Sequence, residues 1–139
     1  MEFRILGPLE VQRDGRPLAL GGGKQRTLLA ALLLEANRVV SSDRLIDLLW
    51  AEPPETARKT LQVHVLQLHR LFGAERIVTD GRGYRIRVEP DELDLERFRG
   101  LVRGGGADRL ERAFAIWRGP PTYAELGMPA PAAARAEVT

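Results

Sequence analysis

Six residues on one predicted helix combine the side-chain types that contact DNA bases and phosphates. They are Lys59, Gln62, Val63, Leu66, Gln67 and Arg70. In a major groove, lysine and arginine reach phosphate or guanine, glutamine can read adenine, and an apolar side chain can touch the thymine methyl group. The residues alone leave a second interpretation open, because Val63 and Leu66 could instead complete a core on a second side of the helix.

The helix that carries these six residues is predicted to run from about residue 54 to residue 72. Pro54 is compatible with its first turn, and Gly73 ends it. A core stripe lies opposite the six residues, because its members are spaced by four, four, three and four and fall within about 40° of one line. They are Ala57, Leu61, Val65, Leu68 and Phe72.

A basic hairpin is predicted directly after this helix. Two alternating strands, 76–79 and 84–88, flank the turn sequence at 80–83. Arg82 lies in the turn, and Arg85 and Arg87 share one face of the second strand. A helix with an exposed face followed by a basic hairpin is typical of a winged helix, in which the hairpin reaches the DNA backbone or minor groove. The alternative for the arginines is a solvated edge strand, whose charges discourage aggregation.

The composition narrows the function classes. The chain has 139 residues, no cysteine, two histidines and a net charge of +2, with 44% hydrophobic and 29% charged residues. Such a chain has room for one domain or for one domain and part of a second. Residues 53–88 hold seven basic and three acidic residues, so the basic charge is local. The N-terminus does not resemble a signal peptide, and no apolar run is long enough for a membrane helix.

The sequence offers no catalytic constellation, no metal-ligand set and no cofactor motif. Asp43 and Asp47 are four residues apart on a polar helix face, where solvated carboxylates are the expected interpretation. The segment 21–25 lacks the Ser/Thr and the first glycine of a phosphate-binding loop. His64 and His69 are five residues apart and fall on different sides of the helix. We therefore expect a protein that is not an enzyme.

The remaining elements are expected to position the helix and the hairpin. Three short antiparallel strands are predicted near the N-terminus, at 3–6, 9–13 and 16–20. A buried helix at 24–37, an extended connector at 38–40 and a helix at 43–51 follow. Beyond a boundary at 89–92, helices are predicted at 93–102 and 107–118. The second carries an apolar stripe of Leu110, Ala113, Phe114 and Trp117.

Several segments together resemble the SARP family of bacterial antibiotic-regulatory activators. They keep a family-like order and spacing over about residues 1–100, at 3–11, 22–26, 36–41, 43–50, 53–58, 61–65 and 83–85. The segments 94–98 and 117–121 resemble the opening of the helical activation domain of this family.

The resemblance implies an α+β fold with an OmpR/PhoB-type winged-helix DNA-binding domain over residues 1–90. It implies a truncated, TPR-like activation domain over residues 91–139. The implied partners are double-stranded DNA with direct repeats near promoters, RNA polymerase holoenzyme and a second copy of the chain. The implied location is the cytoplasm, at the nucleoid, without a membrane partner. The DNA-binding residues so expected are Arg58, Lys59, Thr60, Gln62, Val63, Leu66, Gln67 and Arg70 in the helix, and Arg82 and Arg85 in the wing.

The chain departs from the family late in the recognition helix. The family usually has basic residues there, whereas this chain has Leu66, Gln67 and His69, and only Arg70 is basic. Fewer phosphate contacts lower the affinity and its salt dependence, so a degenerate winged helix that binds another protein is the alternative function. We also expect that a cut after residue 92 spares the DNA-binding fold, and that the stripe on helix 107–118 packs on that fold or on a second chain.

Overall fold

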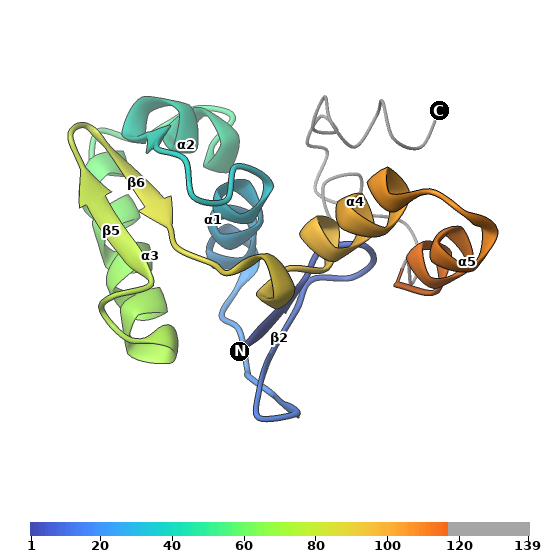
Figure 1. Ribbon diagram of the computed structural model, residues 1–139. Helices are drawn as coiled ribbons and strands as arrows, with labels where there is room; N and C mark the ends of the chain where they lie inside the picture. The colour runs from blue at the N-terminus through green and yellow to red at the C-terminus, as the bar shows by residue number, and fades with distance from the viewer. Residues whose placement is uncertain (117–139) are drawn as a thin grey trace. The chain divides into compact units, whose positions relative to one another are not determined.

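The computed structural model describes residues 1–116, and these form two compact units (Figure 1). The terminal unit consists of Met1–Leu18 together with residues 89–116. The central unit is Ala19–Val88. Among residues 1–116, no helix combines the length and apolar character that crossing a membrane requires.

The terminal unit is built on the predicted N-terminal sheet. Strands β1 (Glu2–Arg4), β2 (Glu10–Arg13) and β3 (Arg16–Pro17) pair antiparallel in the order β1-β2-β3. The turn before β3 places Asp14 and Gly15 at φ values of 53° and 77°, which the paired positive-φ positions of a tight hairpin require. Phe3 pairs with Val11, and both are buried. The expectation of a small antiparallel sheet is confirmed.

Three helical elements complete the terminal unit: the short η1 (Pro90–Glu92), α4 (Asp94–Gly104) and α5 (Ala107–Ile116). Leu93 forms a bridge with Phe3 of β1. The Asp94 carboxylate is buried, and its two oxygens accept the backbone N–H groups of Ile5 and Leu6 at 2.9 Å each. A cut after residue 92 would remove both acceptors from the N-terminal sheet, and the expectation that such a cut spares the DNA-binding fold stays a prediction.

The apolar stripe on α5 is only partly covered. Ala113 is buried, and the Phe114 ring meets the buried Phe98 ring of α4 edge to face at a centroid distance of 6.4 Å. Leu110 nevertheless stays 40% exposed and Phe114 stays 64% exposed. Trp117, the fourth predicted member of the stripe, lies outside the described residues.

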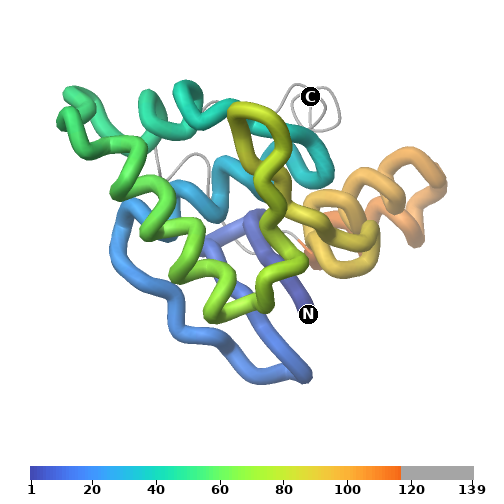
Figure 2. The backbone as a smooth tube through the Cα atoms, turned by 90° about the vertical axis from the view of Figure 1, so that its left-hand side faces the viewer, coloured from blue at the N-terminus to red at the C-terminus, as the bar shows by residue number. Residues whose placement is uncertain are grey.

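The central unit holds three helices and a second sheet. The helices are α1 (Gly23–Leu34), α2 (Ser42–Leu49) and α3 (Ala57–Phe72). The strands are β4 (Val40–Ser41), β5 (Ile77–Asp80) and β6 (Gly83–Ile86), in the order β4-β6-β5. Helix α1 is buried on almost every side, as its run of leucines and alanines predicts. Figure 2 views this unit with α3 toward the reader and the β5–β6 hairpin beside it.

The helices of the central unit are shorter than the sequence predicts. Helix α1 ends at Leu34 rather than at residue 37. Asn37 has a φ of 65°, and its side-chain amide bonds both the N–H and the carbonyl of Val88 at 3.0 Å. Helix α2 begins after Ser41, whose Oγ accepts the Arg44 N–H as an N-cap. Periodicity alone extends α1 to residue 37. The helix ends earlier because Asn37 bonds Val88 through its side chain instead of continuing the helix.

The predicted hairpin is one part of a three-stranded sheet. Strands β5 and β6 pair antiparallel from Ile77↔Ile86 to Asp80↔Gly83, as predicted. The segment predicted as a connector contributes β4, in which Val40 pairs with Tyr84 of β6. Gly83 permits this approach, because a Cβ atom there would overlap the Val40 carbonyl. The wing is thus fixed to the chain segment that enters α2.

Candidate nucleic-acid interface

Helix α3 separates its two faces as the sequence predicts. All five residues of the core stripe are buried, from Ala57 to Phe72. On the opposite face, Val63 is 51% exposed and Leu66 is 49% exposed. Within the part of the chain that the structure describes, nothing packs over these two side chains as a second core. The interpretation of Val63 and Leu66 as core residues is therefore wrong.

The structure places the predicted recognition residues together on this open face. Thr60 is half-buried, and the others are exposed: Arg58, Lys59, Gln62, Val63, Leu66, Gln67 and Arg70. The face is amphipathic in composition, with cations at both ends and amide and apolar side chains between them. Such a surface can offer charge to phosphates and donors, acceptors and methyl groups to base edges.

The wing presents its arginines on the side opposite the core. Tyr84 and Ile86 point into the unit and are buried, whereas Arg85 between them is half-buried. Arg82 lies exposed in the turn between β5 and β6, where the sequence predicts the tip of the hairpin. The Nε atom of Arg85 is buried without a hydrogen-bond partner. The wing thus carries two cations on its outer side.

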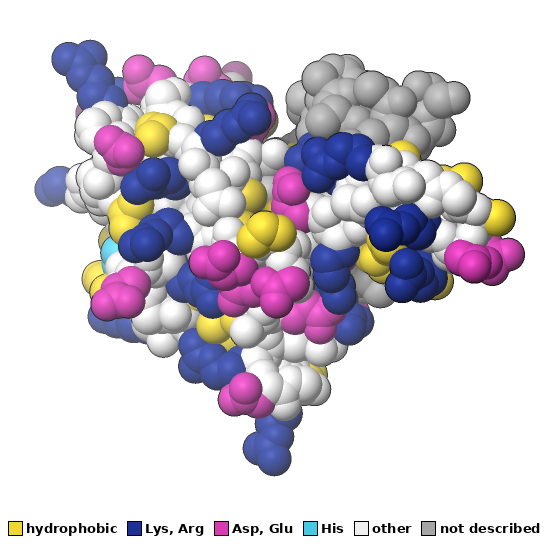
Figure 3. Space-filling view, in the orientation of Figure 1, with side chains coloured by type: hydrophobic (Ala, Val, Ile, Leu, Met, Phe, Trp, Pro, Cys, Tyr) yellow, Lys and Arg dark blue, Asp and Glu magenta, His cyan; other side chains and the backbone are white. Residues whose placement is uncertain are grey.

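Charge pairing distinguishes the basic residues of this surface. Among residues 1–116, no acidic side chain pairs with four cations of α3 and the wing: Lys59, Arg70, Arg82 and Arg85. Arg58 differs, because its guanidinium is paired with the Asp43 carboxylate of α2. Figure 3 shows dark blue basic side chains along the left-hand part of the molecule, over α3 and the β5–β6 hairpin.

One groove joins the start of α3 to the wing. It has a volume of about 470 Å³. Its walls include Arg58 and Gln62 of α3, Arg82 of the wing turn, and Asp43 of α2. Two of the helix residues and one of the wing residues predicted separately from the sequence therefore border the same groove.

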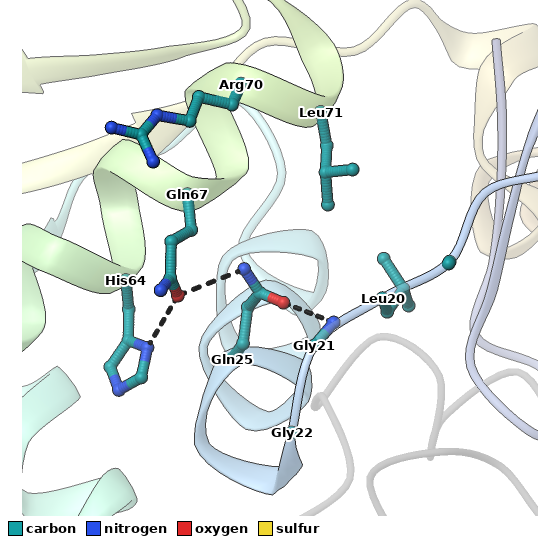
Figure 4. Close-up of a pocket in the computed structure, with 9 residues that line it drawn as sticks. Leu20, Gly21, Gly22, Gln25, His64, Gln67, Arg70 and Leu71 are labelled. Atoms are coloured by element: carbon teal, nitrogen blue, oxygen red, sulfur yellow. Dashed lines mark hydrogen bonds between the residues drawn. The ribbon is translucent and has the colours of Figure 1, made fainter.

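A second hollow, of about 500 Å³, lies beside the later part of α3 (Figure 4). The Gln67 Oε1 atom receives hydrogen bonds from Gln25 Nε2 of α1 at 3.4 Å and from His64 Nδ1 at 3.3 Å. Gln25 itself is 5% exposed, and its own carbonyl oxygen accepts the Gly21 N–H. The sequence does not indicate Gln25 as a site residue, because its segment resembles only an incomplete phosphate-binding loop and one of the family motifs.

The two histidines of α3 are held apart by separate hydrogen bonds. His64 bonds Gln67, whereas His69 Nε2 donates to the Ile77 carbonyl at 2.8 Å. Within residues 1–116, no three His, Asp or Glu side chains gather in a way that could hold a metal ion.

A buried three-helix core, an exposed polar face on the third helix and a basic hairpin after it define the class of winged-helix DNA-binding domains. Residues 15–86 match the family model described as "Transcriptional regulatory protein, C terminal". The chain therefore belongs to this OmpR/PhoB-type family and, with the relatives below, to the SARP-type transcription regulators. The relatives below are transcriptional regulators, and the family is not enzymatic.

Three relatives support this assignment. The chain is 34% identical to the transcriptional regulatory protein MoaR1 of Mycobacterium tuberculosis (strain ATCC 25618 / H37Rv), over 86% of this chain and 45% of MoaR1. It is 36% identical to the regulatory protein AfsR of Streptomyces coelicolor, over 86% of this chain and 13% of AfsR. It is similar to the solved structure of Mycobacterium tuberculosis EmbR in complex with a low-affinity phosphopeptide. The TM-score is 0.76 and the identity 34%, over 91% of this chain and 38% of that one. The chain thus spans less than half the length of these relatives.

Proposed function

We propose that this protein is a pathway-specific activator of secondary-metabolite (antibiotic) genes, which binds direct repeats near promoters and recruits RNA polymerase. The general function, DNA-binding transcription regulation, comes from the family. The gene class, the direct repeats and the polymerase contact come from the resemblance to the SARP activators.

One observation carries the proposed DNA interface. Apart from Arg58, the outer face of α3 and the wing carry cations that have no acidic partner within the described part of the chain, and half-exposed Val63 and Leu66 lie between them. Exposed apolar side chains that are rimmed by polar or charged residues are typical of interaction surfaces. Both features suit a major groove, which offers phosphates at its edges and thymine methyl groups on its floor.

In the proposed complex, α3 enters the major groove and the wing reaches the neighbouring backbone or minor groove. Lys59 and Arg70 contact phosphate or guanine from the two ends of the exposed face. Val63 and Leu66 contact thymine methyl groups, and Gln62 and Gln67 contact base edges. Arg82 and Arg85 bind the backbone beside the groove.

The segment from residue 91 onward contributes the proposed activation function. Residues 1–90 would form the DNA-binding domain, and α4 and α5 would begin a TPR-like activation domain from residue 91. Two protomers would occupy two repeats in tandem, since direct repeats place both copies in the same orientation. The incompletely covered Leu110 and Phe114 of α5 are compatible with a further helical partner.

The same apolar exposure favours a second candidate function. A winged helix that uses Val63 and Leu66 to bind another protein would also leave them half-exposed. The two functions differ in their response to salt, because only the binding of a polyanion releases condensed counterions. Burial of apolar side chains against a protein would change little with salt.

The test is a salt-dependent gel shift with the full chain on the promoter region next to its own gene. Four phosphate contacts predict that log K falls with log salt concentration with a slope of about −3.6. Binding with that slope and a preference over random DNA supports the proposal. The absence of DNA binding at low salt would favour the protein-interaction function.

A further inference from the structure

The hollow beside α3 contains an ordered chain of polar groups that ends at a proposed base-contacting residue. Figure 4 shows the Gln25 and Gln67 amides turned toward each other from α1 and α3, with the His64 ring next to Gln67. The chain of hydrogen bonds runs from the Gly21 N–H to Gln25 and then from Gln25 to Gln67. Each link has a defined donor, so the orientation of each amide is fixed.

The direction of this chain of hydrogen bonds is set at its Gly21 end. The Gly21 N–H can only donate, so it requires the Gln25 carbonyl oxygen. The Gln25 amino group must then face Gln67 and meets its carbonyl oxygen at 3.4 Å. His64 Nδ1, which lies 3.3 Å from the same oxygen, acts as a donor because a carbonyl can only accept.

The Gln67 carbonyl oxygen is consequently saturated. A carbonyl oxygen has two lone pairs, and Gln25 and His64 use both. The amino group of Gln67 lies on the side away from Gln25 in Figure 4. Gln67 itself is exposed. In this arrangement, Gln67 can offer donors to DNA but has no acceptor left.

We propose that Gln67 is a specificity-determining residue that selects guanine, with Gln25 and His64 as positioning residues that keep its carbonyl oxygen occupied. Glutamine reads adenine by donating to N7 and by accepting from the N6 amino group. The bond from N6 requires the glutamine carbonyl oxygen, which in Gln67 is already occupied by Gln25 and His64. Guanine presents two acceptors, O6 and N7, which an amino group can satisfy, whereas thymine presents one. The inference rests on the proposed insertion of α3 into the major groove.

Gly21 provides a way to release Gln67 without changing any residue of the DNA-facing surface. A Cβ atom at Gly21 would overlap the Gln25 amide, so Gly21→Ala displaces that side chain. Nothing lies within 4 Å of a Cβ atom at Gly22, which makes Gly22→Ala the matched control. Both variants replace a glycine by alanine, and both positions precede α1.

The experiment is a selection of binding sites by the full chain from a library of randomised DNA duplexes. Affinities are then measured on four duplexes that differ only at the base assigned to Gln67. We expect the wild-type chain to prefer guanine there by about tenfold. Gln67→Ala makes the four bases equivalent within about twofold and leaves the other positions unchanged. Gly21→Ala moves the preference toward adenine at that position, and Gly22→Ala keeps guanine.

Three results would overturn the inference. One is an adenine preference of the wild-type chain at the position that Gln67→Ala makes degenerate. Another is a Gln67→Ala chain that selects the same site as the wild type, and the third is a Gly21→Ala chain that keeps the guanine preference. A wild-type chain that enriches no sequence would instead contradict the proposed function itself.

Discussion

Three arginines of the terminal unit differ in their partners from the cations on α3 and the wing of the central unit. In the terminal unit, Arg4, Arg97 and Arg99 each lie against a glutamate. The Arg97 Nη2 atom is 2.8 Å from a carboxylate oxygen of Glu2, and the Arg99 Nη1 atom is 2.7 Å from one of Glu96. On α3 and the wing of the central unit, the cations are unpaired within the described residues, except for Arg58. A paired guanidinium stabilises the fold, whereas an unpaired one is available to phosphate.

This difference shows that an arginine-rich composition alone does not indicate DNA binding. The feature that the proposed interface uses is a set of cations on one face that have no acidic partner among residues 1–116, which is a property of tertiary arrangement. It is also a local property, because Arg58 lies on the same helix as Lys59 but is paired with Asp43. The predictions below remove partners in one unit and cations in the other.

The largest effect is expected from Asp94, which anchors the terminal unit. Asp94→Ala leaves the buried N–H groups of Ile5 and Leu6 without an acceptor. Hydrogen bonds to a charged acceptor are worth about 1.5–3 kcal/mol each, so we expect the free energy of unfolding to fall by roughly 3–5 kcal/mol. Urea denaturation measures it. Asp91→Ala, which changes an exposed carboxylate three residues earlier, is the control, and an equal loss in both variants would contradict the anchoring role.

Neutralising the cations of α3 should lower DNA affinity and leave stability unchanged. Lys59→Ala and Arg70→Ala each remove an exposed cation opposite the core stripe. We expect each to weaken operator binding about fivefold and to reduce the salt slope by about 0.9. Fluorescence anisotropy over a salt series measures both quantities, and thermal melting checks the fold. A melting temperature that falls together with affinity would show that the two side chains belong to the core.

The wing arginine should act without regard to sequence. Arg82→Ala removes a cation from the hairpin turn, where it can reach only the backbone or the minor groove. We expect affinity for the operator and for random DNA to fall by the same factor, about threefold, with a flatter salt dependence. Competition gel shifts with both DNAs measure this. An unchanged salt slope would mean that the wing does not touch DNA.

Releasing the paired cation of α3 should produce the opposite change. Asp43→Asn removes the partner of Arg58, so we expect DNA binding to become about twofold to threefold tighter. Asp47→Asn is the matched control, because it removes the same charge from the exposed side of the same helix. Equal tightening in both variants would attribute the effect to net charge rather than to Arg58.

The smallest effect concerns the ion pairs of the terminal unit. Burial raises the pKa of Glu2, but hydrogen bonds from Arg4 and Arg97 outweigh it and hold the pKa below 4.5. A carboxylate with a lowered pKa stabilises the fold above about pH 4.5, and this contribution is lost as the pH falls through the folded-state pKa. Glu2→Gln should therefore reduce stability by less than about 1 kcal/mol at pH 7. Urea denaturation should show that the free energies of unfolding of the wild type and Glu2→Gln differ less at pH 3 than at pH 7. An equal difference at both pH values would contradict this prediction.

The sequence predicts the helices and strands well where one face is buried. The spacing of Leu61, Val65 and Leu68 fixes which side of α3 faces the core, because helical periodicity leaves one solution. The alternation of Tyr84, Arg85 and Ile86 does the same for β6. The sequence does not predict the two-residue strand β4, because this strand is defined by the pairing of Val40 with Tyr84, which lies more than forty residues away.

The interactions that tune the site are the part that the sequence does not predict. Asp43 is interpreted from the sequence as a solvated carboxylate, yet it pairs with Arg58. Gln25 and Gln67 are forty-two residues apart and meet only because α1 packs beside α3. In the sequence, Asp94 is one polar residue among several in an amphipathic helix. Only the fold shows that its carboxylate accepts the N–H of Ile5, just after β1. Such contacts depend on tertiary placement, which periodicity does not encode.

The most direct test of the interface uses two fourfold variants with the same net charge. The first neutralises four cations of α3 and the wing that have no acidic partner among residues 1–116: Lys59→Gln, Arg70→Gln, Arg82→Gln and Arg85→Gln. The second neutralises exposed arginines of the terminal unit: Arg16→Gln, Arg103→Gln, Arg109→Gln and Arg112→Gln. The measurement is the salt slope of DNA binding by anisotropy. We predict that the first variant loses a slope of about 3.6 and the second stays within about one unit of the wild type. Equal losses in the two variants would contradict an interface built on α3 and the wing.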